Sequence, residues 1–144
     1  MNENGLSGSA GQRWKKLPKA IVLDSSAVLA VIFDEPGGEA VVNLLQGGLL
    51  STVNLTEIHT KLLLDGRAAD HAWNRIQSMG FEVCFFDNEQ ARIAAELIGK
   101  TKPFGLSLGD RACLALAIDR KATVYTTDRI WKKLDLGIEI VAIR

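Results

Sequence analysis

Cysteine and histidine are scarce in this sequence, with two of each. Cys84 and Cys113 both lie in apolar runs, where a buried reduced thiol is the simplest interpretation. They predict neither a disulfide framework nor a zinc site, and a reducing compartment fits them. Apolar runs near the roughly 18 residues that span a bilayer are also lacking, as is an N-terminal basic segment followed by an apolar one. We therefore expect a cytoplasmic protein outside the membrane.

An excess of charge of either sign is missing too. Seventeen basic residues balance seventeen acidic ones, and the formal net charge is zero. Bulk attraction to nucleic acid is thereby excluded, so a polyanion would have to be held by a local patch or by bound metal. Hydrophobic residues make up 47% of the 144 positions. A chain of this length buries about 70% of its unfolded surface, which predicts one domain with a real core.

The order of apolar runs and helical patterns predicts the fold. Residues 1–19 are rich in Gly, Ser and Asn and are predicted to be a flexible tail, and residues 20–144 are predicted to form the domain. The expected strands are residues 20–23, 49–53, 81–86, 122–126 and 138–143. The expected helices are residues 25–33, 39–46, 54–64, 67–79, 88–99 and 107–120. Because helices separate the strands, we expect an α/β fold with a mostly parallel five-stranded sheet and helices on both faces.

Four acidic residues occupy positions that this fold would bring to one edge of the sheet. Asp24 and Asp128 directly follow the first and the fourth expected strands. Glu57 and Asp110 stand in the first turns of two helices that start near the same edge. Since ligands of open α/β sheets bind beyond the carboxyl ends of the strands, the four carboxylates are candidates for one site.

Taken one at a time, these acids also have a purely structural interpretation. Asp24 and Asp128 would be N-caps of the helices that follow them, a role worth about 1 kcal/mol. The other two would close capping boxes with a polar residue three positions earlier, Asn54 for Glu57 and Ser107 for Asp110. If the four acids meet at one edge of the sheet, a functional site is the better interpretation. Two carboxylates about 5 Å apart repel by roughly 3 kcal/mol at an effective dielectric near 20, so folding alone would not favour that arrangement.

The donor atoms of this set indicate a particular class of ion. Four carboxylates without His or Cys suit a hard cation such as Mg²⁺ or Mn²⁺ rather than zinc. Such ions keep bound waters that can attack a phosphate, so the predicted chemistry is phosphodiester hydrolysis.

Longer motifs surround the four acids. They are Val22-Leu23-Asp24-Ser25-Ser26-Ala27, Thr56-Glu57, the twelve residues Leu-Ser-Leu-Gly-Asp-Arg-Ala-Cys-Leu-Ala-Leu-Ala from Leu106 to Ala117, and Thr126-Thr127-Asp128. In these motifs the chain resembles PIN-domain nucleases, and among them the VapC-like ribonuclease toxins of bacterial toxin-antitoxin pairs. The resemblance covers about Ile21 to Ile143, and its third motif is long and distinctive.

The resemblance implies a three-layer α/β/α PIN-like domain and a magnesium-dependent endoribonuclease that acts as a toxin, with Mn²⁺ as an alternative ion. Asp24 and Asp110 would be the firmest metal ligands, and Glu57 and Asp128 would complete the catalytic site. The implied partners are an RNA substrate, a cognate antitoxin and a second copy of the chain. An antitoxin groove or dimer contact is expected at the apolar segment 27–33 and at Val41, Val42, Leu44 and Leu45, with core packing as the alternative.

Two other classes of function compete with this interpretation. The first is a non-catalytic PIN-like module that binds RNA or protein. The second is a phosphotransfer receiver or a haloacid-type phosphatase, but Asp24-Ser25-Ser26 lacks the paired acids of the former and the Asp-x-Asp of the latter. Specificity for RNA is expected to rest on surface loops and on a few basic side chains such as Arg111, Arg129, Lys132 and Lys133.

Overall fold

The computed structural model describes residues 19–144, so the tail predicted for residues 1–19 lies outside the described residues except for Lys19. The strands are β1 (Ile21–Leu23), β2 (Leu49–Ser51), β3 (Glu82–Cys84), β4 (Thr123–Thr126) and β5 (Ile140–Ala142). The α-helices are α2 (Ser25–Ile32), α3 (Thr52–Leu64), α4 (Ala69–Gln77), α5 (Asn88–Glu96), α6 (Ile98–Thr101) and α7 (Leu108–Arg120). Short 3-10 helices are η1 (Gly38–Ala40), η2 (Val42–Leu44), η3 (Lys102–Phe104) and η4 (Arg129–Lys133).

The five strands form one sheet in the order β3-β2-β1-β4-β5, and every pair is parallel. The sheet is thus wholly parallel, where the sequence predicted a mostly parallel one. The chain moves outward from β1 to β3 and then returns to the other side of β1 for β4. The strand order therefore reverses between β1 and β4, which is the point where open α/β sheets bind ligands.

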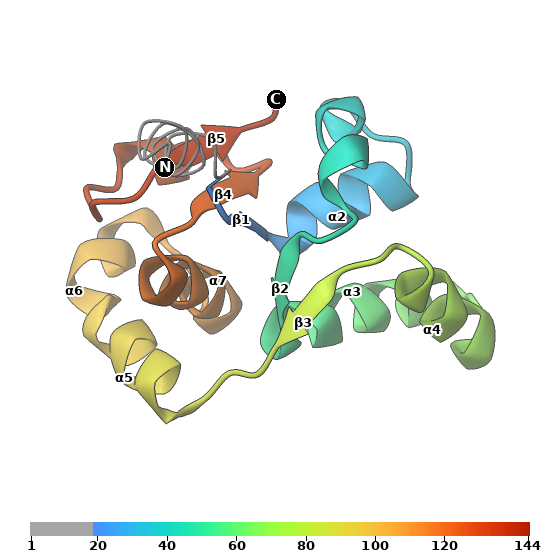
Figure 1. The fold of residues 1–144 in the computed structure, drawn as a ribbon, viewed down its shortest axis with the longest axis horizontal. Helices are drawn as coiled ribbons and strands as arrows, with labels where there is room; N and C mark the ends of the chain where they lie inside the picture. Colours follow the sequence, from blue (N-terminus) through green and yellow to red (C-terminus); the bar gives the residue numbers. More distant parts are fainter. Residues whose placement is uncertain (1–18) are drawn as a thin grey trace, which may run out of the picture.

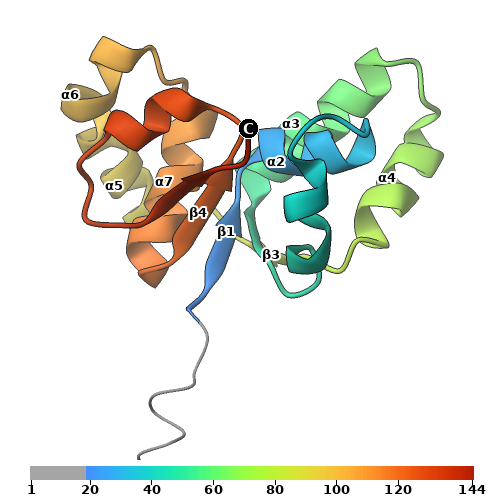
Figure 2. The same ribbon diagram turned by 90° about the horizontal axis from the view of Figure 1, so that it is seen from above.

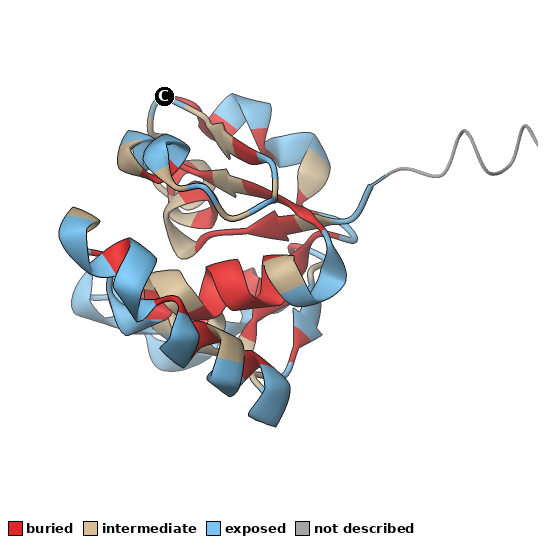
Figure 3. Cartoon of the chain, turned by 90° about the vertical axis from the view of Figure 1, so that its left-hand side faces the viewer, coloured by how far each residue is buried: buried red, intermediate tan, exposed pale blue. Residues whose placement is uncertain are grey.

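Both faces of the sheet are covered by helices, as the continuous apolar strands require (Figures 1 and 2). On one face Val22, Leu49 and Val124 pack with residues of α5 and α7. On the other face Leu23 and Leu50 pack with residues of α2, α3 and α4. Adjacent residues of β1 and of β2 thus belong to different cores, and the architecture is the expected three layers. Buried residues concentrate in the strands and the helices next to them (Figure 3).

Several element boundaries differ from the sequence prediction: most strands are shorter than expected, and the helix expected at 88–99 is divided into α5 and α6. The helix expected at 39–46 is replaced by η1 and η2, with Gly37 in the left-handed region (φ 90°) at the start of η1. The helix expected to begin at Asn54 begins instead at Thr52, because the Ser51 hydroxyl accepts a hydrogen bond from the Val53 N–H and caps it. Asn54 is therefore inside α3 and is not its cap.

Much of the apolar surface predicted to bind a partner is core. Ala27, Val28, Ala30 and Val41 are fully buried, and Leu45 is nearly so. The segment's outward-facing side chains include Leu29 and Phe33, which are partly buried. Among the helices of residues 19–144, none combines the length and the apolar character that a membrane crossing requires.

Helix α7 lies at the centre of the larger core and offers a matched pair of leucines. Leu114 is fully buried, whereas Leu108 on the same helix is 57% exposed. We expect Leu114→Ala to lower the free energy of unfolding by about 2–5 kcal/mol, because it removes buried apolar surface and leaves a cavity. Leu108→Ala should cost less than about 1 kcal/mol. Urea denaturation measures both, and equal losses would contradict this description of the core.

Candidate functional site

The four predicted acids reach the carboxyl edge of the sheet from four separate segments. Asp24 follows β1 and Asp128 follows β4, so these two residues flank the point where the strand order reverses. Glu57 lies in the second turn of α3, and Asp110 lies in the first turn of α7. Because α3 and α7 cover opposite faces of the sheet, their starts contact each other beyond the strand ends.

Asp24 is the most enclosed of the four, with 3% of its surface exposed. Its Oδ2 accepts hydrogen bonds from the Ser26 hydroxyl and from Thr126 Oγ1, the latter at 2.9 Å. The Asp24 side chain makes no capping bond to α2, so the capping interpretation does not explain it. Its Oδ1 is buried and has no hydrogen-bond partner within the described residues. A buried oxygen left unpaired costs free energy, and Oδ1 is therefore free to accept a hydrogen bond or to bind a cation.

Glu57 lies in α3, and its side chain is hydrogen-bonded both to α2 and to α3 itself. Its Oε1 accepts hydrogen bonds from Ser25 Oγ at 3.0 Å and from Asn54 Nδ2 at 2.8 Å. It does not form the predicted capping box, because Asn54 is in the same helix rather than at its N-cap. The carboxylate instead lies against the backbone of Gly109 in α7, where an added Cβ would stand 2.3 Å from Oε2.

Asp110 and Asp128 both make the capping contacts expected of them. The Ser107 hydroxyl accepts a bond from the Asp110 N–H, and Asp110 Oδ2 accepts one from the Ser107 N–H at 2.9 Å, which completes a capping box. Asp128 Oδ1 accepts a bond from the Ile130 N–H at 3.1 Å at the start of η4. Capping therefore accounts for one oxygen of each carboxylate, and within residues 19–144 the other oxygen accepts no such hydrogen bond.

The charges of the four acids act on one another. Burial raises the pKa of Asp24 to about 6, against the lowering effect of Ser26 and Thr126, and the charges of Asp110 and Glu57 add to the rise. Burial also raises the pKa of Asp110, with further increases from Glu57 and Asp128. The charged forms of Asp24 and Asp110 are thus destabilised by burial and by neighbouring acids, which is the repulsion expected when carboxylates gather without a cation.

The donor atoms fit a hard divalent cation, although the side chains do not yet enclose one. No group of three or more His, Cys, Asp or Glu side chains in residues 19–144 is arranged to hold a metal ion. Each carboxylate is turned toward neutral hydroxyl, amide or backbone donors instead. The unpaired Asp24 Oδ1 and the all-oxygen chemistry of the set are the observations that fit a cation such as Mg²⁺.

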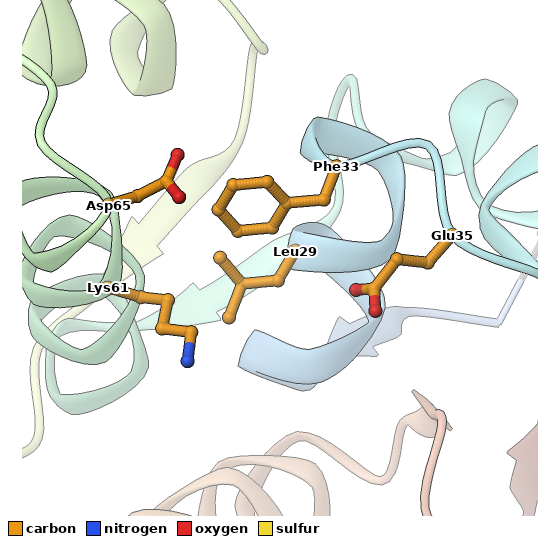
Figure 4. A pocket seen from close by; sticks show the side chains of 5 residues that line it. All are labelled: Leu29, Phe33, Glu35, Lys61 and Asp65. Carbon is orange, nitrogen blue, oxygen red and sulfur yellow. The ribbon is translucent and has the colours of Figure 1, made fainter.

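A hollow of about 420 Å³ is lined by residues of α2 and α3 and of the segments that follow these helices. Two of its lining residues, Leu29 and Lys61, lie one helical turn after Ser25 and Glu57, which are joined by a hydrogen bond. Figure 4 shows Leu29 of α2 and Phe33, which directly follows α2, facing Lys61 of α3 and Asp65, which directly follows α3. The Arg67 guanidinium stands 5.5 Å from the centre of the Phe33 ring. The hollow is therefore an apolar groove with a charged rim.

The sequence model of the PIN domain matches residues 21–136, which include all four acids. The chain belongs to the PIN domain family. A search of curated proteins finds no match to this PIN domain.

Solved structures with the same fold include several toxin-antitoxin complexes. A chain of "VapBC2 from Rickettsia felis bound to a DNA fragment from their promoter" is 16% identical, with a TM-score of 0.66, and the match covers 85% of this chain and 97% of that one. A chain of a "toxin-antitoxin complex from Klebsiella pneumoniae" is 14% identical, with a TM-score of 0.68 and coverages of 87% and 98%. A chain of VapBC-5 from Mycobacterium tuberculosis is 24% identical, with a TM-score of 0.58 and coverages of 86% and 98%. These similarities support the predicted PIN-like fold.

Several neutral residues of the site were not singled out from the sequence. Ser25 and Ser26 belong to the motif around Asp24, but the sequence assigns them no role in the site, and it suggests Asn54 only as the partner of Glu57 in a capping box. A usable signal was present, because residues three apart on a helix share a face and Asn54 is three residues before Glu57. The place of Gly109 against Glu57 depends on the packing of two helices that are distant in sequence, and nothing local indicates it.

The basic side chains expected to contact RNA are mostly engaged within the protein. Arg111 Nη1 donates to the Ala94 carbonyl at 2.9 Å. Arg129 Nε donates to the Arg144 carbonyl at 2.6 Å, and Lys132 Nζ donates to the Ile140 carbonyl at 3.2 Å. In this structure these three side chains therefore bond backbone carbonyls of α5 and of the C-terminal segment.

The raised pKa of Asp24 predicts how stability depends on pH. The folded state keeps this proton up to pH about 6, whereas the unfolded chain loses it near the ordinary value of 3.8. The folded state thus binds more protons in this window, and stability should fall by up to about 3 kcal/mol as the pH rises from about 4 to about 6. Urea unfolding in EDTA at several pH values measures the slope.

Two substitutions on the same background control this measurement. Asp24→Asn should remove most of the slope and leave a protein that is more stable than the parent at pH 7. Asp119→Asn changes an exposed acid of α7 and should leave the slope as it is. An unchanged slope in the Asp24 variant would contradict the assignment.

Proposed function

We propose that this PIN domain is a metal-dependent endoribonuclease that acts as the toxin of a toxin-antitoxin pair. The observation that carries the proposal is the set of four acids from distant segments at the reversal point of the sheet, with Asp24 buried and one of its oxygens unpaired. Family membership supports a nuclease, and the complexes that share this fold support the toxin role.

In this proposal Asp24 and Asp110 are the principal ligands of Mg²⁺ or Mn²⁺, and Glu57 and Asp128 complete the site. A bound divalent ion would supply Lewis acidity and a water of lowered pKa for attack on phosphorus. Ser26 and Thr126 fix Asp24 by hydrogen bonds, and Ser25 and Asn54 fix Glu57. The chain's own residues thus orient the carboxylates and compensate part of their charge before a substrate arrives.

Cleavage of RNA should require the ion and the two principal acids. With a single-stranded RNA substrate, Mg²⁺ should switch cleavage on and EDTA should switch it off. We expect Asp24→Asn and Asp110→Asn each to lower the rate by about 1000-fold or more, because a positioned ion contributes several kcal/mol to the barrier. Gel analysis of labelled RNA measures the rates.

Asp119→Asn is the control, because it removes an exposed carboxylate from the same helix as Asp110. Cleavage that persists in EDTA, or that survives both site substitutions, would exclude the proposed mechanism. A protein that binds RNA without cleaving it under any of these conditions would be the non-catalytic binding module instead.

The groove between α2 and α3 is the proposed contact for the antitoxin. It is apolar along Leu29 and Phe33, it is large enough for side chains of a partner, and it begins one helical turn from the Ser25–Glu57 hydrogen bond. In this proposal a partner segment that extends one turn beyond the groove would cover the acids. We further propose a homodimer, which the exposed apolar side chains of Leu63, Leu64 and Trp73 on α3 and α4 support.

The antitoxin is expected to be the product of a small neighbouring open reading frame, and its co-expression should reverse toxicity. Leu29→Asp and Phe33→Ala should each weaken binding of that protein by about 10-fold or more, because central apolar contacts dominate such interfaces. Ile98→Ala, which alters a 46% exposed residue of α6 away from the groove, should have no effect. Calorimetric titration measures the affinities. Equal binding by all variants would show that the antitoxin binds outside this groove.

A further inference from the structure

The fully buried side chain of Asn54 joins α3 to α7. Its Nδ2 donates to Glu57 Oε1 at 2.8 Å and to the Gly109 carbonyl at 3.1 Å. Both partners are oxygens that only accept hydrogen bonds, so the orientation of the amide is fixed by chemistry. One amide group therefore links the Glu57 carboxylate to the residue that directly precedes Asp110.

This arrangement is not explained by stability alone. Asn54 Oδ1 is buried and has no hydrogen-bond partner within residues 19–144. A buried amide that satisfies only its donor side costs free energy, and an apolar side chain of similar volume would avoid that cost. The role of the Asn54 amide therefore lies in the two hydrogen bonds that its Nδ2 donates, to Glu57 and to Gly109.

Gly109 supplies the other half of the contact. A Cβ at this position would stand 2.3 Å from Glu57 Oε2 and 2.7 Å from Glu57 Cδ. The Glu57 carboxylate therefore fills the space in which any other residue would carry its side chain. Asn54 draws the carboxylate toward α7 from one side, and the missing side chain of Gly109 allows it to lie against the helix.

Repulsion makes such a support necessary. The charge of Glu57 adds to the raised pKa of both Asp24 and Asp110, so the donors that hold Glu57 oppose a repulsion among these three acids. Ser25 provides one donor from α2, and Asn54 provides the second from α3 itself. Of these two donors, Asn54 is the one that also bonds α7, and it thereby ties the position of Glu57 to the turn that carries Asp110.

We propose that Asn54 is a positioning residue that acts together with Gly109 to hold Glu57 beside Asp110 for a shared divalent cation. The inference rests on the proposed function, in which Glu57 completes the metal site. Asn54 itself touches neither the ion nor the substrate in this role. Its effect on metal affinity passes entirely through Glu57.

A double-substitution experiment tests this dependence. Mn²⁺ binding is measured by calorimetry for the parent, Asn54→Leu, Glu57→Ala and the double variant. Asn54→Leu should weaken binding by about 10- to 100-fold in the parent, the usual effect of losing a group that orients a ligand. In the Glu57→Ala background the same change should have no further effect, because the group it positions is gone.

Asn74→Leu, at an exposed position of α4, is the matched control and should bind Mn²⁺ like the parent. If Asn54→Leu does not fold, Asn54→Ala replaces it, since this smaller side chain removes the same donor without adding a charge beside Glu57. Equal Mn²⁺ binding by the parent and the Asn54 variant, or equal losses with and without Glu57, would overturn the positioning role.

A thermal measurement without metal separates this inference from the proposed function. Gly109→Ala should lower the Tm in the parent, because the new Cβ collides with the Glu57 carboxylate. In the Glu57→Ala background the same change should raise the Tm, because the collision is gone and Ala favours a helix over Gly. A loss of the same size in both backgrounds would refute the packing of Glu57 on Gly109. A parent protein that takes up no Mn²⁺ would refute the metal site itself, whatever the thermal result.

Discussion

Repulsion among the carboxylates at the carboxyl edge of the sheet is the interaction on which the arrangement of the site depends. Burial raises the pKa of Asp24 and of Asp110, and the charges of neighbouring acids of the set add to both rises. Neutral donors oppose this repulsion, each supplied by a nearby hydroxyl, amide or backbone N–H. A divalent cation would offset the remaining charge, which is the physical basis of the proposed metal site.

The parallel sheet decides where this repulsion is concentrated. All strands end at the same edge, and the return of the chain to β4 beside β1 places Asp24 and Asp128 on adjacent strands. Helices α3 and α7 begin at this edge from opposite faces and bring Glu57 and Asp110 to it. The sheet separates the two hydrophobic cores, and beyond the strand ends the contact of Asn54 with Gly109 connects α3 to α7.

The site and the proposed partner surface share structural elements. Ser25 and Glu57 are joined by a hydrogen bond near the start of α2 and α3, while Phe33 and Asp65 line the groove directly after the ends of these helices. A partner bound in the groove would therefore contact the helices that carry Ser25 and Glu57. The proposed inhibition by an antitoxin and the proposed role of Glu57 thus depend on the same pair of helices.

The fold class, the order of the strands along the chain and the four candidate acids could be predicted from the sequence, because apolar runs and residues at strand ends are local signals. The capping box of Asp110 was also predicted, since Ser107 and Asp110 are three residues apart. The sequence did not predict that Asn54 bonds the Gly109 carbonyl or that the Glu57 carboxylate lies against Gly109. Asn54 and Gly109 are 55 residues apart, and both contacts depend on how α3 and α7 pack, which no local pattern encodes.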